Sequence, residues 1–135
     1  MNFKFKEQNP EASRRRQESS KIREKYPDRV PIICEKDPSS KIGDIDKNKY
    51  LVPNDLTVSQ FSFIIRKRLA LQKSSALFLL VNGKYSIQGE VTLSEIYEKY
   101  KDSEDGFLYI FYAAEVVYGS DWIKILNELN KYTKM

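Results

Sequence analysis

The chain of 135 residues contains no histidine. This absence excludes Ser-His-Asp and Cys-His catalysis and removes the commonest metal ligand. The chain also has a single cysteine, Cys34, so it can form no internal disulfide, which fits a reducing, cytoplasmic setting. We interpret Cys34 as a small buried hydrophobic residue and not as a reactive thiol. We predict no catalytic residue, no metal site and no cofactor, and therefore not an enzyme.

Long hydrophobic runs are missing as well. The longest strongly apolar run, Ala76 to Val81, is far too short to span a bilayer. Phe3 and Phe5 alternate with lysines, and the apolar segment that a signal peptide requires does not follow them. Attachment to a membrane would therefore need a covalent lipid or a helix lying on the surface.

Positive charge is concentrated at the N-terminus. Residues 1–29 hold nine Lys/Arg and five Asp/Glu, whereas the remainder holds fourteen of each, so the net charge of +4 arises in this segment. Such a segment favours an anionic membrane, an acidic protein surface or nucleic acid, although a solvated basic helix fits the charge equally well. Only the run Arg14–Arg16 points to nucleic acid, and we do not expect nucleic acid to be a partner.

An N-terminal helix is predicted to begin at Asn9, because an N-cap side chain, a proline and then an acid follow one another. It extends to Lys25 and cannot pass Pro27. Few apolar residues lie within it, so we expect it to lie on the surface of a domain.

The remaining segments alternate between strand and helix patterns. Thr57 with Gln60 and Thr92 with Glu95 are capping boxes that open two helices, and Asn82-Gly83 predicts a two-residue hairpin turn. Strands are predicted at 30–35, 49–52, 77–81, 85–87 and 107–112. This order predicts an α+β fold, the ubiquitin-like β-grasp, in which a helix packs on one sheet face.

The segment from Lys47 to Pro53 is the most informative. Tyr50 to Val52 are strand formers, whereas Pro53 cannot donate to a ladder and so ends the strand or keeps it at an edge. Lys47 and Lys49 are typical of a guarded sheet edge. Such an edge is either only protected, or a site where a partner peptide adds a strand.

Several segments resemble GABARAP-type autophagy modifiers, in one register over roughly residues 1–119. They are Lys21–Pro31, Ile42–Asp44, Lys49–Pro53, Asp55–Val58 and Phe63–Arg68. The resemblance implies a ubiquitin-like β-grasp with two extra N-terminal helices and a C-terminal extension. Residues 1–28 would be the N-terminal helical extension, 29–119 the β-grasp core and 120–135 a propeptide-like tail.

The resemblance also implies conjugation to a lipid. A cysteine protease would cut after Gly119, which matches the glycine cut in the family and is preceded by Tyr118. Activating and conjugating enzymes would then join the new carboxylate to phosphatidylethanolamine on autophagosomes and cytoplasmic vesicles. Glycine lacks Cβ and can thread a narrow enzyme channel. Without the resemblance, Gly119 would be interpreted as the end of a helix or strand.

A second implied function is the binding of autophagy receptors and adaptors with aromatic-x-x-aliphatic motifs along the strand Lys49–Val52. The pocket for the aromatic residue would comprise Glu18, Ile22, Pro31, Lys49, Leu51 and Phe107. The pocket for the aliphatic residue would comprise Tyr50, Val52, Pro53, Leu56, Phe61, Ile64 and Ile65. Acids beside the motif would be attracted by Arg29, Lys47, Lys49 and Arg68. For Ile65, a purely structural role fits as well.

Two departures from the family pattern stand out. Lys84 to Gly89 lacks the proline-rich turn common in the family, which leaves the path of this loop and some enzyme contacts open. In addition, sixteen residues follow Gly119. Their apolar residues fit one face of a short amphipathic helix: Trp122, Ile125, Leu126 and Leu129. Asp121 to Ile125 is nevertheless an acid followed by aromatic-x-x-aliphatic, and we hypothesise that the uncut tail occupies the peptide site, more easily in trans than in cis.

One alternative of a different class stays open. The chain would then be an unconjugated adaptor in vesicle trafficking or at microtubules, with tubulin as a partner that the resemblance hints at. A measured mass of the cellular protein separates the two, because only a conjugated modifier ends at Gly119.

Overall fold

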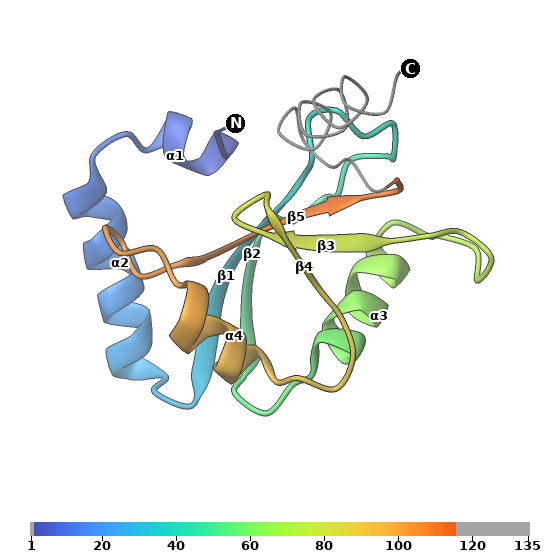
Figure 1. Cartoon of the computed structure of the whole chain (residues 1–135). Coiled ribbons are helices and arrows are strands. Elements are labelled where there is room, and N and C mark those ends of the chain that lie inside the picture. The colour runs from blue at the N-terminus through green and yellow to red at the C-terminus, as the bar shows by residue number, and fades with distance from the viewer. Residues whose placement is uncertain (1, 116–135) are drawn as a thin grey trace, which may run out of the picture.

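The computed structural model describes residues 2–115, and the predictions for Tyr118, Gly119 and residues 120–135 lie outside them. The chain forms a five-stranded mixed sheet with helices against both faces (Figure 1). In order, the elements are α1 (Lys4–Gln8), α2 (Ala12–Lys25), β1 (Arg29–Lys36), β2 (Lys49–Pro53), α3 (Val58–Arg68), β3 (Phe78–Val81), β4 (Tyr85–Ile87), α4 (Leu93–Tyr100) and β5 (Leu108–Ala113). The predicted β-grasp with two N-terminal helices is confirmed.

The strands lie in the order β2-β1-β5-β3-β4. β1 and β5 are parallel, and the other neighbours are antiparallel. β2 and β4 are the two edges, so the predicted edge strand at Lys49–Val52 is confirmed. Pro31 pairs with Leu51 of β2, but pairing of β1 with β5 starts only at Ile32. Because of this offset, the missing N–H of Pro31 breaks no ladder.

The two faces of the sheet carry separate hydrophobic clusters. The larger one packs α3 and α4 against the alternate residues of the strands, with Phe61, Ile65 and Leu93 at 0% exposure. The smaller one covers the opposite face and includes Phe3 and Phe5 of the N-terminal segment, with Ile22 of α2 beside it. Side chains of a strand alternate between faces, and this allows one sheet to bury both layers.

The start of α3 is as predicted. Gln60 N–H donates to Thr57 Oγ1 (3.1 Å) and Thr57 N–H donates to Gln60 Oε1 (2.9 Å), which completes the capping box. At α4 only half of the box forms within the described residues, because Glu95 N–H donates to Thr92 Oγ1 (3.3 Å) and the Glu95 side chain makes no return bond.

The predicted helix start at Asn9 is wrong. α2 begins at Ala12, with Glu11 as an N-cap that makes no side-chain bond. Asn9 instead closes the preceding helix, since its side-chain amide donates to Phe5 O (3.0 Å). An Asn-Pro pair between two helices serves the end of the first as readily as the start of the second.

The predicted hairpin turn forms, with one more residue in the loop. Asn82 and Gly83 have φ of 56° and 69°, and Lys84 N–H donates to Val81 O (3.0 Å). Pairing resumes at Tyr85, which faces Val81, so Lys84 is an extra residue. A Cβ at Gly83 would lie 2.9 Å from the Phe111 ring, so both the turn and the packing require glycine.

A buried ion pair fixes α2 to the turn before β5. Arg15 Nε lies 2.7 Å from Asp105 Oδ2, with side chains only 5% and 0% exposed. Asp105 also accepts from Tyr109 Oη (2.5 Å) and from Phe107 N–H (2.9 Å), and its backbone carbonyl accepts from Ser19 Oγ. The buried charges are therefore paired and also hydrogen-bonded.

Replacing Arg15 by Met should destabilise the protein by roughly 3–5 kcal/mol, because it leaves a buried carboxylate without its cation. Arg14→Met is the matched control, since the Arg14 side chain is 80% exposed and should contribute less than about 0.5 kcal/mol. Chemical denaturation measures both values. Equal losses in the two variants would contradict this account of the ion pair.

Candidate functional site

Within residues 2–115, the outer edge of β2 has no neighbouring strand. Cys34 N–H donates to Asn48 O (2.8 Å) and Asn54 N–H donates to Asp28 O (2.9 Å), one at each end of the β1–β2 ladder. Since bonded pairs alternate in an antiparallel ladder, Tyr50 and Val52 face β1. The N–H and C=O of Lys49 and Leu51 therefore face outward. We call β2 and its flanking side chains the β2 edge site.

The predicted aromatic pocket comes together on the face covered by α2. Lys49 and Leu51 point to this face, and Lys49 Nζ lies 2.6 Å from Glu18 Oε1 of α2. Pro31 pairs with Leu51 and lies on the same face. Ile22 and the buried Phe107 belong to the cluster on this face. The six residues thus form one surface, which we call the α2 side, with the Lys49–Glu18 pair at its rim.

Phe5 adjoins this surface, although it was not among the predicted site residues. The Phe5 ring packs edge-on against Phe107 at 5.4 Å between centroids, and Lys49 Nζ lies 5.1 Å from the Phe5 ring centroid. Glu35 fixes the segment by accepting the N–H groups of Lys4 (2.7 Å) and Phe5 (2.9 Å). The sequence signal that could have indicated this position of Phe5 is the presence of aromatic residues in a highly charged N-terminal segment.

The predicted aliphatic pocket lies on the opposite face, which we call the α3 side. Tyr50 and Val52 point here from β2, and the Tyr50 ring meets Phe61 edge-on at 5.5 Å. Phe61 and Ile65 are 0% exposed, so they form the floor and belong to the core. The residues accessible to a partner on this side are Leu56 and Ile64. Pro53 is exposed, but it pairs with Arg29 and therefore lies on the α2 side with Lys49 and Leu51, so this part of the predicted pocket does not come together. An apolar pocket of about 380 Å³ adjoins Leu56 and Ile64.

Tyr50 carries an unusual hydroxyl in this wall. The group is buried, and no partner for it lies among the described residues. Burial raises the pKa of Tyr50 above its ordinary value, so it stays neutral at physiological pH. Burial likewise raises the pKa of the Cys34 thiol, which is 0% exposed, and this fits the interpretation of Cys34 as a hydrophobic residue.

Four cations surround the β2 edge. Lys47 Nζ and the Arg68 guanidinium lie 5.4 Å and 5.7 Å from the Tyr50 ring centroid, and Arg68 also pairs with Asp46 (3.1 Å). Arg29 Nη1 donates to Leu51 O at 3.4 Å, which fits an outward-facing carbonyl. With Lys49, these residues give the edge a positive rim that favours acidic side chains in a partner.

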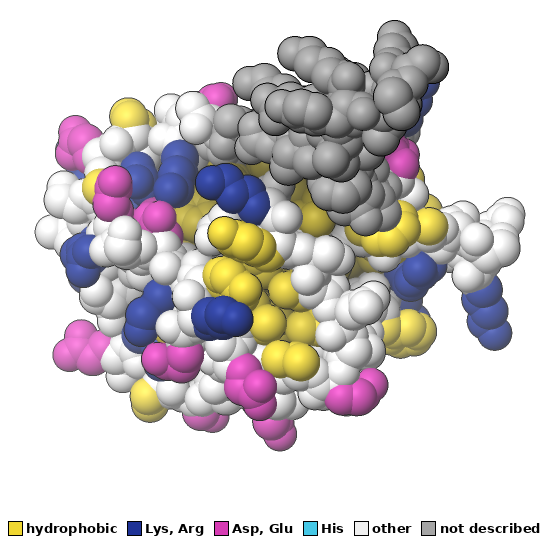
Figure 2. All heavy atoms as spheres, viewed as in Figure 1, with side chains coloured by type: hydrophobic (Ala, Val, Ile, Leu, Met, Phe, Trp, Pro, Cys, Tyr) yellow, Lys and Arg dark blue, Asp and Glu magenta, His cyan; other side chains and the backbone are white. Residues whose placement is uncertain are grey.

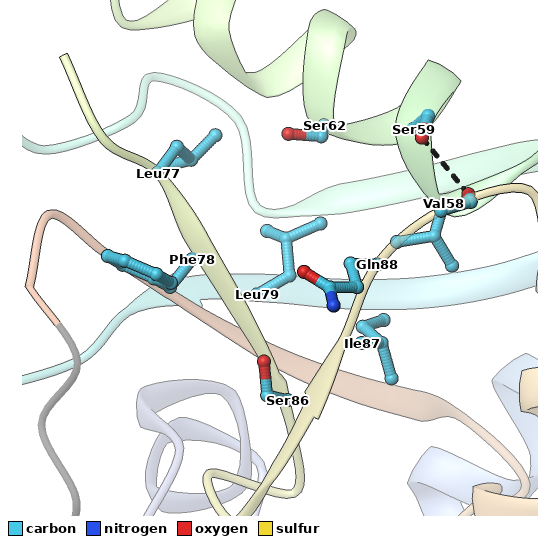
Figure 3. Close-up of a pocket in the computed structure, with 10 residues that line it drawn as sticks. Val58, Ser59, Ser62, Leu77, Phe78, Leu79, Ser86, Ile87 and Gln88 are labelled. Atoms are coloured by element: carbon cyan, nitrogen blue, oxygen red, sulfur yellow. Dashed lines mark hydrogen bonds between the residues drawn. The ribbon is translucent and has the colours of Figure 1, made fainter.

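A further pocket, of about 220 Å³, lies between α3 and the β3–β4 hairpin (Figure 3). Ser59 Oγ donates to Gly89 O (3.1 Å) at one end of it. None of the residues predicted to bind peptide lines this pocket, and it adjoins β4, the edge farther from β2. In the view of Figure 2, hydrophobic side chains gather at the centre of the molecule. Tyr85 of β4 is 52% exposed.

Two other findings concern membranes and metals. Among residues 2–115, no helix is long and apolar enough to cross a membrane. The same part of the chain has no group of three or more possible ligand side chains that could hold a metal ion.

The fold and the edge define a class of protein, the ubiquitin-like β-grasp protein with two N-terminal helices. A family model described as "Autophagy protein Atg8 ubiquitin like" matches residues 14–119. Autophagy-related protein 8 of Pichia angusta is 50% identical over 119 residues, covering 88% of this chain and 93% of the relative. The crystal structure of Trypanosoma brucei ATG8 matches with a TM-score of 0.77 and 44% identity, over 88% of this chain and 100% of that one. The chain therefore belongs to the Atg8 family of ubiquitin-like autophagy proteins.

The register of β2 makes a prediction for amide hydrogen exchange. The Lys49 and Leu51 amides face outward and should exchange at least about tenfold faster than those of Tyr50 and Val52, which bond to β1. Exchange followed by NMR on the free chain measures all four. Equal protection of the odd and even positions would contradict the proposed register of free groups.

Proposed function

We propose that this protein is a modifier and not an enzyme, joined through Gly119 to phosphatidylethanolamine, and that it recruits receptors during autophagosome formation. Membership of the Atg8 family supports this proposal. The observation that carries the receptor-binding part is the free β2 edge with an apolar surface on each face of the sheet.

The geometry of an added strand explains the motif that such receptors would carry. Successive side chains of a strand point to opposite faces, so residues i and i+3 also lie on opposite faces. A peptide on the β2 edge would place its aromatic residue on the α2 side and its aliphatic residue on the α3 side. Backbone bonds to Lys49 and Leu51 would supply affinity without regard to sequence.

The positions of the two surfaces favour one direction for the peptide. The α2 side is built around Lys49 and Leu51, whereas the accessible part of the α3 side includes Leu56, beyond the end of β2. A peptide with the aromatic residue first therefore runs parallel to β2. Acids before the motif then approach Lys47 and Lys49, which strengthens encounter more than final affinity.

We expect conjugation at Gly119, because it matches the glycine after which members of the family are cut. A cysteine protease would hydrolyse the Gly119–Ser120 bond, and ATP would adenylate the released carboxylate with loss of pyrophosphate. Two enzyme thiols would carry it in turn as a thioester, until the lipid amine displaces the thiol and forms an amide. The two acyl chains each bury many CH₂ groups, at about 0.8 kcal/mol apiece, and would hold the chain on autophagosome and vesicle membranes from the cytoplasm.

Mass spectrometry of the protein from its own cells tests conjugation. We expect a species ending at Gly119, and one carrying phosphatidylethanolamine there. Gly119→Ala should abolish both, because a Cβ blocks the enzyme channels. Only full-length, unmodified chain would favour the alternative, an unconjugated trafficking or microtubule adaptor, and a lipidated mutant would refute the assignment of Gly119.

Peptide affinity tests the β2 edge site. Leu51→Arg places a charge on the α2 side and should weaken an aromatic-x-x-aliphatic peptide at least about tenfold, or ~1.4 kcal/mol. Tyr85→Arg is the matched control at the opposite edge, where Tyr85 is also surface-exposed. Calorimetric titration measures both. A stronger loss in Tyr85→Arg than in Leu51→Arg would move the site to the other edge.

A further inference from the structure

We propose that the first ligand of the β2 edge site is the tail of a second copy of this chain, through residues 121–125. This inference rests on the proposed peptide-binding function of that edge. It would make the uncut protein self-associating and its receptor site occupied until cleavage after Gly119 removes the tail.

The chemistry of the tail segment fits the two surfaces of the site. Trp122 and Ile125 are three residues apart and therefore point to opposite faces of an added strand. Trp122 would meet the α2 side and Ile125 the α3 side. Asp121 would then precede the motif, beside Lys47 and Lys49 at the start of β2, so the charges are complementary.

The path of the chain favours a second copy over the same copy. β5 is parallel to β1, which is antiparallel to β2, so β5 delivers the chain to the end where β2 begins. Ile33 of β1 pairs with Lys49 of β2 on one side and with Tyr109 of β5 on the other, so Lys49 and Tyr109 lie at the same height in the sheet. The last described residue, Glu115, lies six positions after Tyr109. β5 carries the chain about 13 Å past this level to Ala113, and bends follow at residues 114 and 115. A strand added at β2 lies three strand spacings, or roughly 15 Å, to the side, so the separation is about 20–25 Å.

The connection available within one chain has little slack. Seven steps join Glu115 to Trp122, and these span roughly 24 Å at full extension. Glu115 is further held at the β1–β2 connection, where its carboxylate accepts Lys41 N–H (3.2 Å) and Ser40 Oγ accepts Ala114 N–H (3.0 Å). A tail in its own site would have to be nearly extended and also pass the β1–β2 connection. A tail from another copy has no such constraint.

Trp122 is the only tryptophan in the chain, so its fluorescence reports the tail directly. In the full chain we expect emission at short wavelength at about 100 μM, moving to longer wavelength on dilution. A competing peptide with phenylalanine as its aromatic residue should cause the same shift. Sedimentation should show a mass that rises with concentration above the 15.9 kDa of one chain.

Three variants of the full chain provide the controls. Leu51→Arg should keep Trp122 at long wavelength and the protein monomeric at every concentration. Tyr85→Arg, at the opposite edge, should behave as the unaltered chain. Trp122→Ala should also remain monomeric, and it should bind receptor peptide more tightly than the unaltered chain at 100 μM, by at least about threefold.

Two results would overturn the inference. Emission that Leu51→Arg does not change would place the tail elsewhere, as for an amphipathic helix packed on another surface. Emission that responds to Leu51→Arg but not to dilution would place the tail in its own site. Receptor peptide binding by Trp122→Ala separates this failure from that of the proposed function. If that variant binds, only the tail inference is lost; if it does not, the β2 edge site itself is refuted.

Discussion

The contact on which the rest of the structure depends is the buried pair of Arg15 and Asp105. It joins α2 to the turn before β5, 90 positions away in sequence, and Ser19 and Tyr109 bond to the same aspartate. Held in this place, α2 presents Glu18 to Lys49 of β2. The α2 side of the edge site therefore depends on the Arg15–Asp105 ion pair, because this pair holds α2 beside β2.

The two-faced sheet explains why one edge can bind two side chains of a partner, one on each face. Helices cover both faces, so the apolar surface left accessible beside β2 is divided between the α2 side and the α3 side. An added strand alternates its side chains between the same two sides. Phe61 and Ile65 serve both the core and the site, because they are fully buried and lie beneath the residues that a partner can reach.

Features that depend on local pattern could be predicted from the sequence. The capping box at Thr57 and the proline-closed strand at Lys49–Pro53 need only neighbouring residues. Asn9 was misassigned because an amide caps either of two adjoining helices. The Arg15–Asp105 pair and the place of Phe5 beside Phe107 depend on distant segments meeting, which no local pattern contains. The edge strand could be predicted from its residues alone, whereas the two pockets beside it were predicted only from the family resemblance.

The most direct test of this account is scalar coupling across hydrogen bonds, measured by NMR on the protein bound to an aromatic-x-x-aliphatic peptide. We expect couplings from the Lys49 and Leu51 amides to peptide carbonyls, together with a parallel register along β2. A bound peptide that shows no such coupling at β2, and instead couples to amides of β4, would contradict it.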